Sequence, residues 1–403
     1  MSGAKISFAE FVAMLALCMS LVALSIDTML PALPDIAAAY DIARLNDQQY
    51  MITFLFAGLA IGQLIAGPLS DSLGRKAGIY VGIVVFVIGS LISYFSSTYE
   101  LMLAGRFIQG LGASSPRVVT IAMVRDRYEG RDMARVMSYI MGVFILVPTL
   151  APAFGQGIMY LMDWRSIFLV FVAIALAILL WVGLRSEETL NPLDKRPFTL
   201  PVIWGGLVTV CTNKMTVCYT VSAGLIFGAL MGYINSAQQI FQNLYNVGDM
   251  FALYFGITAL TLGVAFFVNA RLVRRLGMRR VVIWSLMALL CVAVLFGVFE
   301  YSAHGNVPLL GFVAFMMASS FCMGMCFGNF NALAMVPMGH MAGIASSVIG
   351  AVSLVVAIML GGAIGQFYDG TLLPLTCGIL GASVLALLFA KIAEGDKFLE
   401  KAI

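Results

Sequence analysis

The chain has 403 residues, of which 61% are hydrophobic and only 11% are charged, and its formal net charge is +3. Soluble globular domains are about 45–50% apolar and about 25% charged, so this composition excludes an ordinary soluble domain and also a disordered chain. Long apolar runs indicate membrane spans instead, because an α-helix needs about 20 residues to cross about 30 Å of hydrocarbon. Nearly all of the seven cysteines lie in apolar runs, which argues against a disulfide framework, and two histidines offer little material for a metal site.

Apolar runs in the first half of the chain predict six membrane-spanning helices. Their approximate ranges are 8–33, 48–68, 77–96, 100–122, 134–157 and 164–184. A charged interval that contains prolines, 185–197, follows and is typical of a linker between domains. The short apolar run 200–212 predicts an interfacial helix that leads into the next span.

Six further apolar runs predict six spans in the second half of the chain. Their approximate ranges are 215–243, 250–270, 280–299, 307–330, 343–366 and 372–391. The sequence therefore predicts an all-α membrane protein with twelve transmembrane helices. We divide it into an N-terminal six-helix bundle at 1–185, a cytoplasmic linker with an interfacial helix at 186–213 and a C-terminal six-helix bundle at 214–403.

Lysine and arginine are distributed unevenly between the two sides of this arrangement. With the N-terminus inside, the outer loops carry only Arg44 and Arg165, Arg106 and Arg117 lie within a span, and all other basic residues fall on the inner side. Cytoplasmic loops are enriched in Lys and Arg, so both termini are expected to be cytoplasmic.

Two loops at equivalent places in the two halves resemble each other. The loop after the second span reads GPLSDSLGRK at 67–76, and the loop after the eighth reads ARLVRRLGMR at 270–279. Gly74 and Gly277 occupy the same place in these loops and are about half a chain length apart. This spacing predicts two six-helix halves related by an axis along the membrane normal, with a binding site near mid-membrane between them.

Several motifs resemble those of the major facilitator superfamily, and within it the drug:proton antiporters of the Bcr/CflA group. The loop at 67–76 is similar to the superfamily signature between helices 2 and 3, and LSIDTMLPALP at 24–34 is similar to the helix 1 signature of that group. RFIQG at 106–110 resembles the helix 4 motif of proton-coupled members, and VRD at 124–126 and HMAGIASS at 340–347 also look like that group. The resemblance spans essentially the whole chain.

The resemblance implies a bacterial inner-membrane exporter of drug-like molecules that is driven by the proton gradient, with a link to antibiotic resistance. Two features depart from the family pattern. Residues 151–157 read APAFGQG, with Gln156 where the helix 5 antiporter motif has a glycine, so a looser helix contact is expected there. Arg117 stands where relatives carry a small residue, which puts the usual neutral or cationic substrate profile in question.

Asp27 is the first candidate for proton coupling. It is flanked by apolar sequence in the first span, and an acid inside the membrane is a candidate functional group because burying its charge is costly. Asp27 and Arg106 reach a similar depth from opposite directions, so we expect them to interact and protonation of Asp27 to release Arg106. The alternative is that Asp27 only caps the helix before Pro31 and Pro34.

Arg106 and Arg117 are separated by nearly three helical turns of about 3.6 residues and therefore share one face of the fourth span. Both are expected to face the bundle or a wet cavity rather than lipid. Arg117 either binds an anionic or carboxylate-bearing substrate, or makes a structural hydrogen bond to a neighbouring helix, or lies near the inner headgroups.

Polar side chains in the second half are candidates for lining the substrate cavity. Span 7 carries more of them than lipid contact tolerates: Tyr233, Asn235, Gln238, Gln239 and Gln242. We assign Tyr233, Asn235 and Gln239 to substrate binding, and also Asn331 near the inner end of span 10. The alternative for each is hydrogen bonding between helices.

The loop after the second span is predicted to form an inner gate, made of Gly67, Asp71, Gly74, Arg75 and Asp126. The two glycines permit a tight turn where helices approach. Asp71 is suited to meet a helix N-terminus in the other half, and Arg75 is expected to pair with Asp126. Such contacts would bias the outward-open state, whereas the alternative is that the loop only anchors the inner side by its positive charge.

The sequence thus predicts a proton-coupled secondary transporter that exports drug-like small molecules by alternating access. The alternative is a dedicated exporter or importer of a metabolite or a carboxylate-rich siderophore. No phosphate-binding GxxxxGK[ST] motif and no catalytic constellation is present, so neither ATP drive nor an enzyme is favoured. We expect the small-molecule substrate, protons and membrane lipid as partners, a monomer, and no cofactor, metal or nucleic acid.

Overall fold

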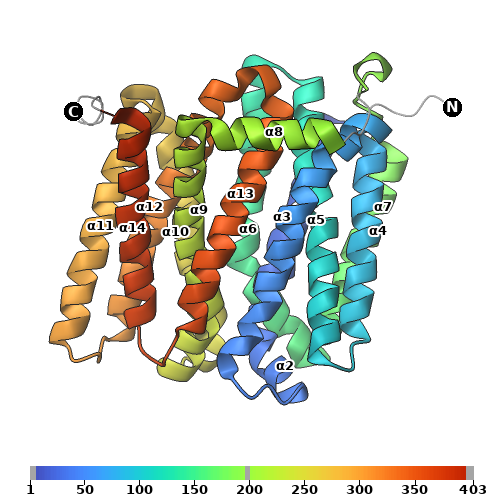
Figure 1. The fold of residues 1–403 in the computed structure, drawn as a ribbon. Helices are drawn as coiled ribbons and strands as arrows, with labels where there is room; N and C mark the ends of the chain where they lie inside the picture. The colour runs from blue at the N-terminus through green and yellow to red at the C-terminus, as the bar shows by residue number, and fades with distance from the viewer. Residues whose placement is uncertain (1–5, 196–199, 396–403) are drawn as a thin grey trace. The chain divides into compact units, whose positions relative to one another are not determined.

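The computed structural model describes residues 6–195 and 200–395, so part of the predicted linker, 196–199, lies outside the described residues. The described residues form α-helices joined by short 3₁₀ and π segments, and none of them forms a β-strand. Figure 1 shows the long helices of each half running alongside one another.

Contacts within the chain define two compact units. The first unit consists of Met1–Ile42 and Tyr50–Trp204, and the second of Ala43–Gln49 and Gly205–Ile403. The short segment 43–49 therefore packs with the second unit, although the helices before and after it belong to the first.

The first unit contains the helices α1 to α7 in chain order. Their bounds are α1 Phe8–Asp27, α2 Leu33–Ala39, α3 Tyr50–Leu73, α4 Arg75–Tyr94, α5 Tyr99–Arg127, α6 Gly130–Leu161 and α7 Ser166–Arg185. Helix α8, Leu200–Thr212, occupies the run that was predicted to be an interfacial helix.

The second unit contains the helices α9 to α14 and two short segments. The helices are α9 Lys214–Gln238, α10 Phe251–Leu276, α11 Met278–Ser302, α12 Leu309–Met335, α13 Ala342–Gln366 and α14 Leu373–Glu394. The π segment η4, Gln239–Leu244, continues α9, and the 3₁₀ segment η2, Leu45–Gln49, lies between α2 and α3 in the chain.

Eleven helical segments of the described residues are long and apolar enough to cross a membrane. Helix α5 is not among them, because its interior arginines Arg106 and Arg117 and its other polar residues lower its hydropathy, although 29 residues are ample to span a bilayer. The twelve predicted spans correspond to these eleven segments and α5. The prediction of an all-α membrane protein is confirmed.

The first predicted span, 8–33, lies within one apolar helical segment, Phe8–Ala39, and this segment is interrupted near its end. Helix α1 ends at Asp27, a 3₁₀ turn follows at Leu30–Ala32, and α2 begins at Leu33. Pro31 and Pro34 cause the break, because proline lacks the N–H that an α-helix requires and disfavours helical geometry in the residue before it. Asp27 is therefore the last residue of α1.

Glycines bring α5 into close contact with its neighbours. A Cβ atom on Gly110 would lie 1.9 Å from the carbonyl oxygen of Leu55 in α3, and one on Gly112 would lie 2.2 Å from the backbone nitrogen of Phe86 in α4. Small residues permit such backbone contact between membrane helices. Helix α5 is thereby held against α3 and α4, which places Arg106 in the interior of the unit.

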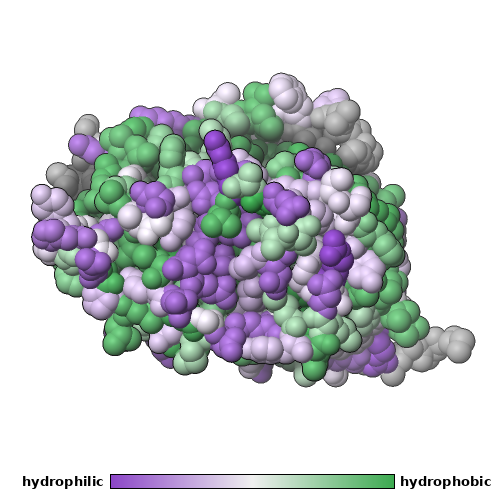
Figure 2. All heavy atoms as spheres, turned by 90° about the horizontal axis from the view of Figure 1, so that it is seen from below, coloured by the Kyte–Doolittle hydropathy of each residue, from purple (hydrophilic) through white to green (hydrophobic). Residues whose placement is uncertain are grey.

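The distribution of hydrophilic and hydrophobic residues on the surface matches that of membrane helices, whose ends reach water and whose sides contact lipid. Figure 2 shows many hydrophilic residues on the face at which α2 lies and hydrophobic residues around its edge. Large apolar side chains on the flanks of α7 and α11 are exposed, among them Leu180, Leu295 and Val298.

Candidate functional site

Asp27 lies in the interior of the first unit and is only 4% exposed. Among the described residues, no hydrogen bond or ion pair reaches its carboxyl group. Buried acids are almost always paired, because an isolated charge is unfavourable in apolar surroundings. An unpaired carboxyl group in this position is well suited to bind a proton, since protonation removes the charge.

Helix α6 makes a close contact beside Asp27. A Cβ atom on Gly155 would lie 2.1 Å from the carbonyl oxygen of Thr28, the residue that follows Asp27. The contact through Gly155 is therefore tight, although Gln156 departs from the family motif. The looser contact expected at this motif is not seen at Gly155.

Arg106 is fully buried and has acceptors for each part of its guanidinium group. Its Nη2 donates to the carbonyl oxygen of Ser25 at 2.8 Å, its Nε donates to that of Met51 at 3.3 Å, and its Nη1 donates to Gln109. Gln109 in turn donates to Ser90 Oγ at 2.9 Å. These bonds satisfy a buried cation without a carboxylate partner.

The expected contact between Asp27 and Arg106 is not present among the described residues. Arg106 binds the backbone of Ser25, two residues before Asp27, instead of the carboxyl group. The two residues do lie at a similar depth, as predicted. Because Arg106 has neutral acceptors, its hydrogen bonds do not depend on the charge of Asp27.

Arg117 differs from Arg106 in its surroundings. It is half-buried on α5, and no hydrogen bond or ion pair of its guanidinium group is found among the described residues. One turn further on, Thr120 is buried and its Oγ1 also lacks a partner. Arg117 is therefore a cation inside a membrane helix whose donors remain available.

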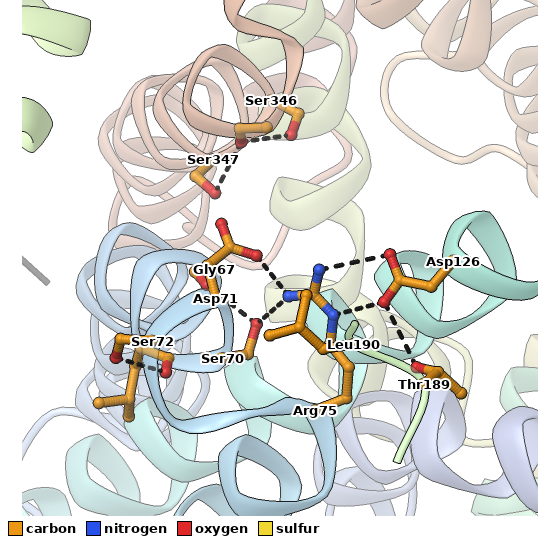
Figure 3. A network of polar contacts seen from close by, with 12 residues as sticks. Gly67, Ser70, Asp71, Ser72, Arg75, Asp126, Thr189, Leu190, Ser346 and Ser347 are labelled. Atoms are coloured by element: carbon orange, nitrogen blue, oxygen red, sulfur yellow. Dashed lines mark hydrogen bonds and ion pairs between the residues drawn. The ribbon is translucent and has the colours of Figure 1, made fainter. Parts of the chain in front are cut away.

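Arg75 lies between two carboxylates at the end of the first unit where α3 and α4 meet (Figure 3). Its Nε donates to Asp126 at 2.7 Å, and its Nη1 donates to Asp71 and, at 2.9 Å, to Ser70 Oγ. The Arg75 side chain is 3% exposed. The structure thus contains the predicted ion pair of Arg75 with Asp126 and adds Asp71 to it, while the role of these residues as a gate stays a prediction.

Glu188, which sequence reasoning missed, caps the start of α4. The backbone N–H of Arg75 donates to its carboxylate at 2.9 Å and that of Lys76 at 3.1 Å, while Gly74 precedes them with a positive φ of 111°. Loss of hydration alone would raise the pKa of Glu188, but four backbone N–H donors outweigh it and lower the pKa below its usual value. The residue after Glu188, Thr189, donates to Asp126 at 3.3 Å. The segment after α7 therefore joins Arg75, Asp71 and Asp126, which we call the Arg75 cluster.

The polar residues assigned to α9 make hydrogen bonds within the second unit. The hydroxyl groups of Tyr233 and Thr258 are 2.7 Å apart, and Asn235 Nδ2 donates to the Gly361 carbonyl oxygen of α13 at 3.0 Å. Asn331 donates to its own helix, at Phe327. These contacts match the alternative of hydrogen bonding between helices for Tyr233 and Asn235, and cavity lining stays a prediction.

The segment 43–49 carries three amide side chains, Asn46, Gln48 and Gln49 of η2, and we call this segment the amide strap. Gln239 is one of the residues that bind it. Gln239 Nε2 donates to Asn46 Oδ1 at 2.9 Å, and Gln49 Nε2 donates to Gln239 Oε1 at 2.7 Å. Gln48 donates to Gln238 at 3.0 Å. Four of these side chains are buried: Gln48, Gln49, Gln238 and Gln239.

Asn46 also connects the strap to the end of α13. Its Nδ2 donates to the carbonyl oxygens of Gln366 at 3.0 Å and Tyr368 at 2.7 Å, and Gln366 Nε2 donates back to the Asn46 carbonyl oxygen at 3.0 Å. The strap contains no charged group in these bonds. Sequence reasoning assigned Gln239 to substrate binding but did not predict that residues 46–49 bind it.

The second unit has its own carboxylate contact where α14 ends. The Glu394 side chain is 4% exposed and accepts hydrogen bonds from Arg279 Nε, at 2.6 Å, and from the hydroxyl group of Tyr219. Arg279 is the second residue after Gly277, whose φ is 82°, whereas Arg75 directly follows Gly74. In both units, an acid near the end of the last membrane helix binds the start of the helix after the repeated loop.

No group of three or more His, Cys, Asp or Glu side chains in the described part of the chain is placed to hold a metal ion.

The sequence profile described as Major Facilitator Superfamily matches residues 15–362. The chain belongs to the major facilitator superfamily.

Curated relatives of this superfamily member cover most of its length. It is 30% identical over 349 residues to the uncharacterized MFS-type transporter YdgK of Bacillus subtilis, with 85% of each chain covered. It is 27% identical over 369 residues to the bicyclomycin resistance protein homolog of Haemophilus influenzae, with 91% of each covered. It is 30% identical over 338 residues to the multidrug resistance protein MdtL of Escherichia fergusonii, which covers 81% of this chain and 80% of the relative.

Solved structures share the major facilitator fold with this chain. The human organic anion transporter MFSD10 (TETRAN) superposes with a TM-score of 0.70 at 16% identity, covering 96% of this chain and 99% of that one. The xylose transporter XylE from E. coli superposes with a TM-score of 0.67 at 13% identity, covering 95% and 96%. The fold and the family predicted from the motifs are confirmed, and the chain is a secondary transporter, not an enzyme.

Two parts of this major facilitator protein's polar network were missed from the sequence. Glu188 lies in the interval that was interpreted as a linker, where a charge run is usually solvated. The concentration of amides at 46–49 was the available signal for the strap, because three amide side chains in one short loop require partners when they are buried.

Proposed function

We propose that this chain exports drug-like small molecules across the bacterial inner membrane in exchange for protons. The observation that carries the proposal is the buried, unpaired carboxyl group of Asp27. In the proposed cycle, proton binding at Asp27 and substrate binding alternate in one central cavity. Rocking of the two halves then exposes that cavity to each side of the membrane in turn.

The relatives support export of drug-like compounds. One is named as a bicyclomycin resistance protein homolog and another as a multidrug resistance protein. At this level of identity the fold and transport cycle are shared more readily than the substrate, so we assign the chemical class and not a compound.

We propose roles for the polar residues in two groups. Asp27 and Arg106 serve proton coupling, Arg106 by holding the backbone at Ser25 beside the titrating carboxyl group. Substrate contacts are assigned to Asp27, Arg117, Tyr233, Asn235, Gln239 and Asn331. The last four of these residues already make hydrogen bonds within the protein. A substrate must therefore replace those bonds or use the hydrogen-bonding capacity that each side chain has left.

The Arg75 cluster is proposed as the inner gate. It ties α3, α4 and α5 of the first unit together through Asp71 and Asp126, and Glu188 adds the segment after α7. We further propose that both termini are cytoplasmic, that the protein acts as a monomer and that six-helix bundles at 1–185 and 214–403 are joined by a linker at 186–213.

The decisive experiment is transport in proteoliposomes with an imposed pH gradient. We expect Asp27→Asn to abolish gradient-driven transport of a fluorescent cationic substrate. Asp35→Asn is the matched control, because Asp35 is an exposed acid of α2 close by in the chain. Gradient-driven transport by Asp27→Asn at the wild-type rate would remove Asp27 from the coupling role.

A dedicated carrier of a carboxylate-bearing metabolite or siderophore is the second candidate function. The available donors of Arg117 favour it, since a planar guanidinium group binds carboxylates well. A panel of neutral, cationic and acidic compounds separates the two functions. Under the second function, only acidic compounds are transported, and Arg117→Gln reduces their transport selectively. Equal loss for all compounds would contradict a role of Arg117 in recognition.

A further inference from the structure

The end of α10 and the start of α11 carry a dense cluster of positive charge. Five arginines and no acid lie between 271 and 280. At the place where the first repeated loop has Asp71, this loop has Arg274. The first unit neutralises its Arg75 with two carboxylates, whereas the second copy of the loop contains no carboxylate to do so.

Most of these arginines have no ionic partner. Within the described residues, Arg279 pairs with Glu394, but Arg271, Arg274 and Arg275 are exposed and form no ion pair. Arg274 Nε donates only to a carbonyl oxygen of its own helix, that of Ala270, at 3.1 Å. Their remaining N–H groups are available to an external anion.

A cavity of 530 Å³ lies beside these side chains. It is lined by Arg271, Arg274 and Arg275 and by two aliphatic residues, Val268 and Leu272. Val268 and Leu272 are partly buried against a small core that contains Ala265 and Met325. The cations therefore lie toward the end of α10 and Val268 toward its middle, so the lining is charged at one end and apolar at the other.

We propose that this cavity binds an anionic phospholipid of the membrane. The headgroup phosphate is held by Arg271, Arg274 and Arg275, and the glycerol and upper acyl chain lie along Val268 and Leu272. Basic pockets at the ends of membrane helices suit anionic headgroups, and arginine binds phosphate with several directed hydrogen bonds. The apolar part of the lining favours a lipid over free phosphate, which would leave that surface uncovered.

The test measures lipid retained by the purified full-length protein, by native mass spectrometry after exchange into mixed micelles with phosphatidylglycerol or phosphatidylcholine. We expect phosphatidylglycerol adducts on the wild type and at least a fivefold loss in R271Q/R274Q/R275Q. The control variant is R125Q/R127Q/R135Q, which removes the same charge from arginines of the first unit, of which Arg127 and Arg135 stack on aromatic rings. We expect that control to stay within twofold of the wild type.

Equal lipid loss in both variants would mean general attraction to a basic surface and would overturn the proposal. A second measurement needs no variant: thermal unfolding of delipidated wild-type protein after addition of phosphatidylglycerol, phosphatidylcholine or inorganic phosphate. Stabilisation by phosphatidylglycerol alone supports the site. Equal stabilisation by phosphatidylcholine or by inorganic phosphate contradicts a site for an anionic lipid.

Discussion

Gln239 Nε2 donates a hydrogen bond to Asn46 Oδ1 at 2.9 Å, although 193 residues separate the two in the chain. This bond belongs to a strap that leaves the first unit after Ile42 and returns to it at Tyr50. Both ends of the strap are covalently attached to the first unit, while its side chains bind α9, η4 and α13. Residues 43–49 therefore join the second unit through amide hydrogen bonds of their side chains and the first unit through the continuous chain alone.

Replacing Asn46 tests how much the strap contributes to stability. Asn46→Ala removes two donated bonds and one accepted bond, and we expect it to lower the free energy of unfolding by about 1–3 kcal/mol. Asn46→Asp should be worse, because a carboxylate would face two carbonyl oxygens. Thermal unfolding in detergent measures both variants, with Arg44→Ala at an exposed neighbouring position as the control. Unchanged unfolding temperatures for both variants would show that the strap is not stabilising.

Glu188 predicts a specific dependence of stability on pH. Its pKa is lower in the folded protein than its unfolded value of about 4.3, so its stabilising contribution is complete above that pH and disappears as the pH falls through the folded pKa. Glu188→Gln should therefore unfold more easily than the wild type near neutral pH and equally easily in strong acid. Helix caps contribute about 0.5–2 kcal/mol, and exposure of Glu188 favours the lower end.

Thermal unfolding across a pH series checks this dependence. Glu187→Gln is the control, since Glu187 is exposed and adjacent in the chain. A difference between the wild type and Glu188→Gln that stays constant down to the most acidic pH would contradict the assignment.

Arg75 holds two carboxylates at once, which gives its variants an ordered series. Lysine has the charge but not the fork of donors, so Arg75→Lys should keep part of the transport rate and Arg75→Ala almost none.

Removing one partner of a buried ion pair costs about 3–5 kcal/mol, and the 30% exposure of the Asp71 side chain reduces this value. Neutralising the acids in Arg75→Ala/Asp71→Asn/Asp126→Asn should recover stability. Failure of the triple variant to exceed Arg75→Ala in unfolding temperature would argue against charge as the cause.

Gly110 predicts a steric effect at the contact of α5 with α3. A Cβ atom there would meet the carbonyl oxygen of Leu55 at 1.9 Å, so Gly110→Ala must separate the helices and displace Arg106. Overpacking costs about 1–3 kcal/mol, and we expect the upper end because the obstacle is backbone. Gly142→Ala is the matched control within α6, where no atom lies within 4 Å, and should be neutral or slightly stabilising. Similar unfolding temperatures for the two variants would refute the steric argument.

Sequence reasoning succeeded where the signal was local. Apolar runs located the spans, because a bilayer imposes a length, and the loop at 67–76 identified the residues that surround Arg75. It was less successful for contacts between distant segments. The similar depth of Asp27 and Arg106 was predictable from span ends, but the acceptor that Arg106 binds, the Ser25 carbonyl oxygen, depends on how α1 and α5 pack together.

The same limitation explains Glu188 and the amide strap. A carboxylate in a linker and three amides in a loop are polar residues in polar segments, so their composition does not distinguish solvated side chains from paired ones. Their partners, the start of α4 and the α9–α13 surface, are defined only when helices far apart in the chain pack together.

The strap also constrains the order in which the protein can mature. Residues 43–49 leave the ribosome long before their binding partners exist, since Gln366 is synthesised 320 residues after Asn46. At about 5–20 residues per second, the amides wait on the order of tens of seconds before they can pair. Completion of this connection is therefore a late event in biogenesis, because a nascent chain that stalls before α13 lacks Gln366 and Tyr368, whose carbonyl oxygens accept from Asn46.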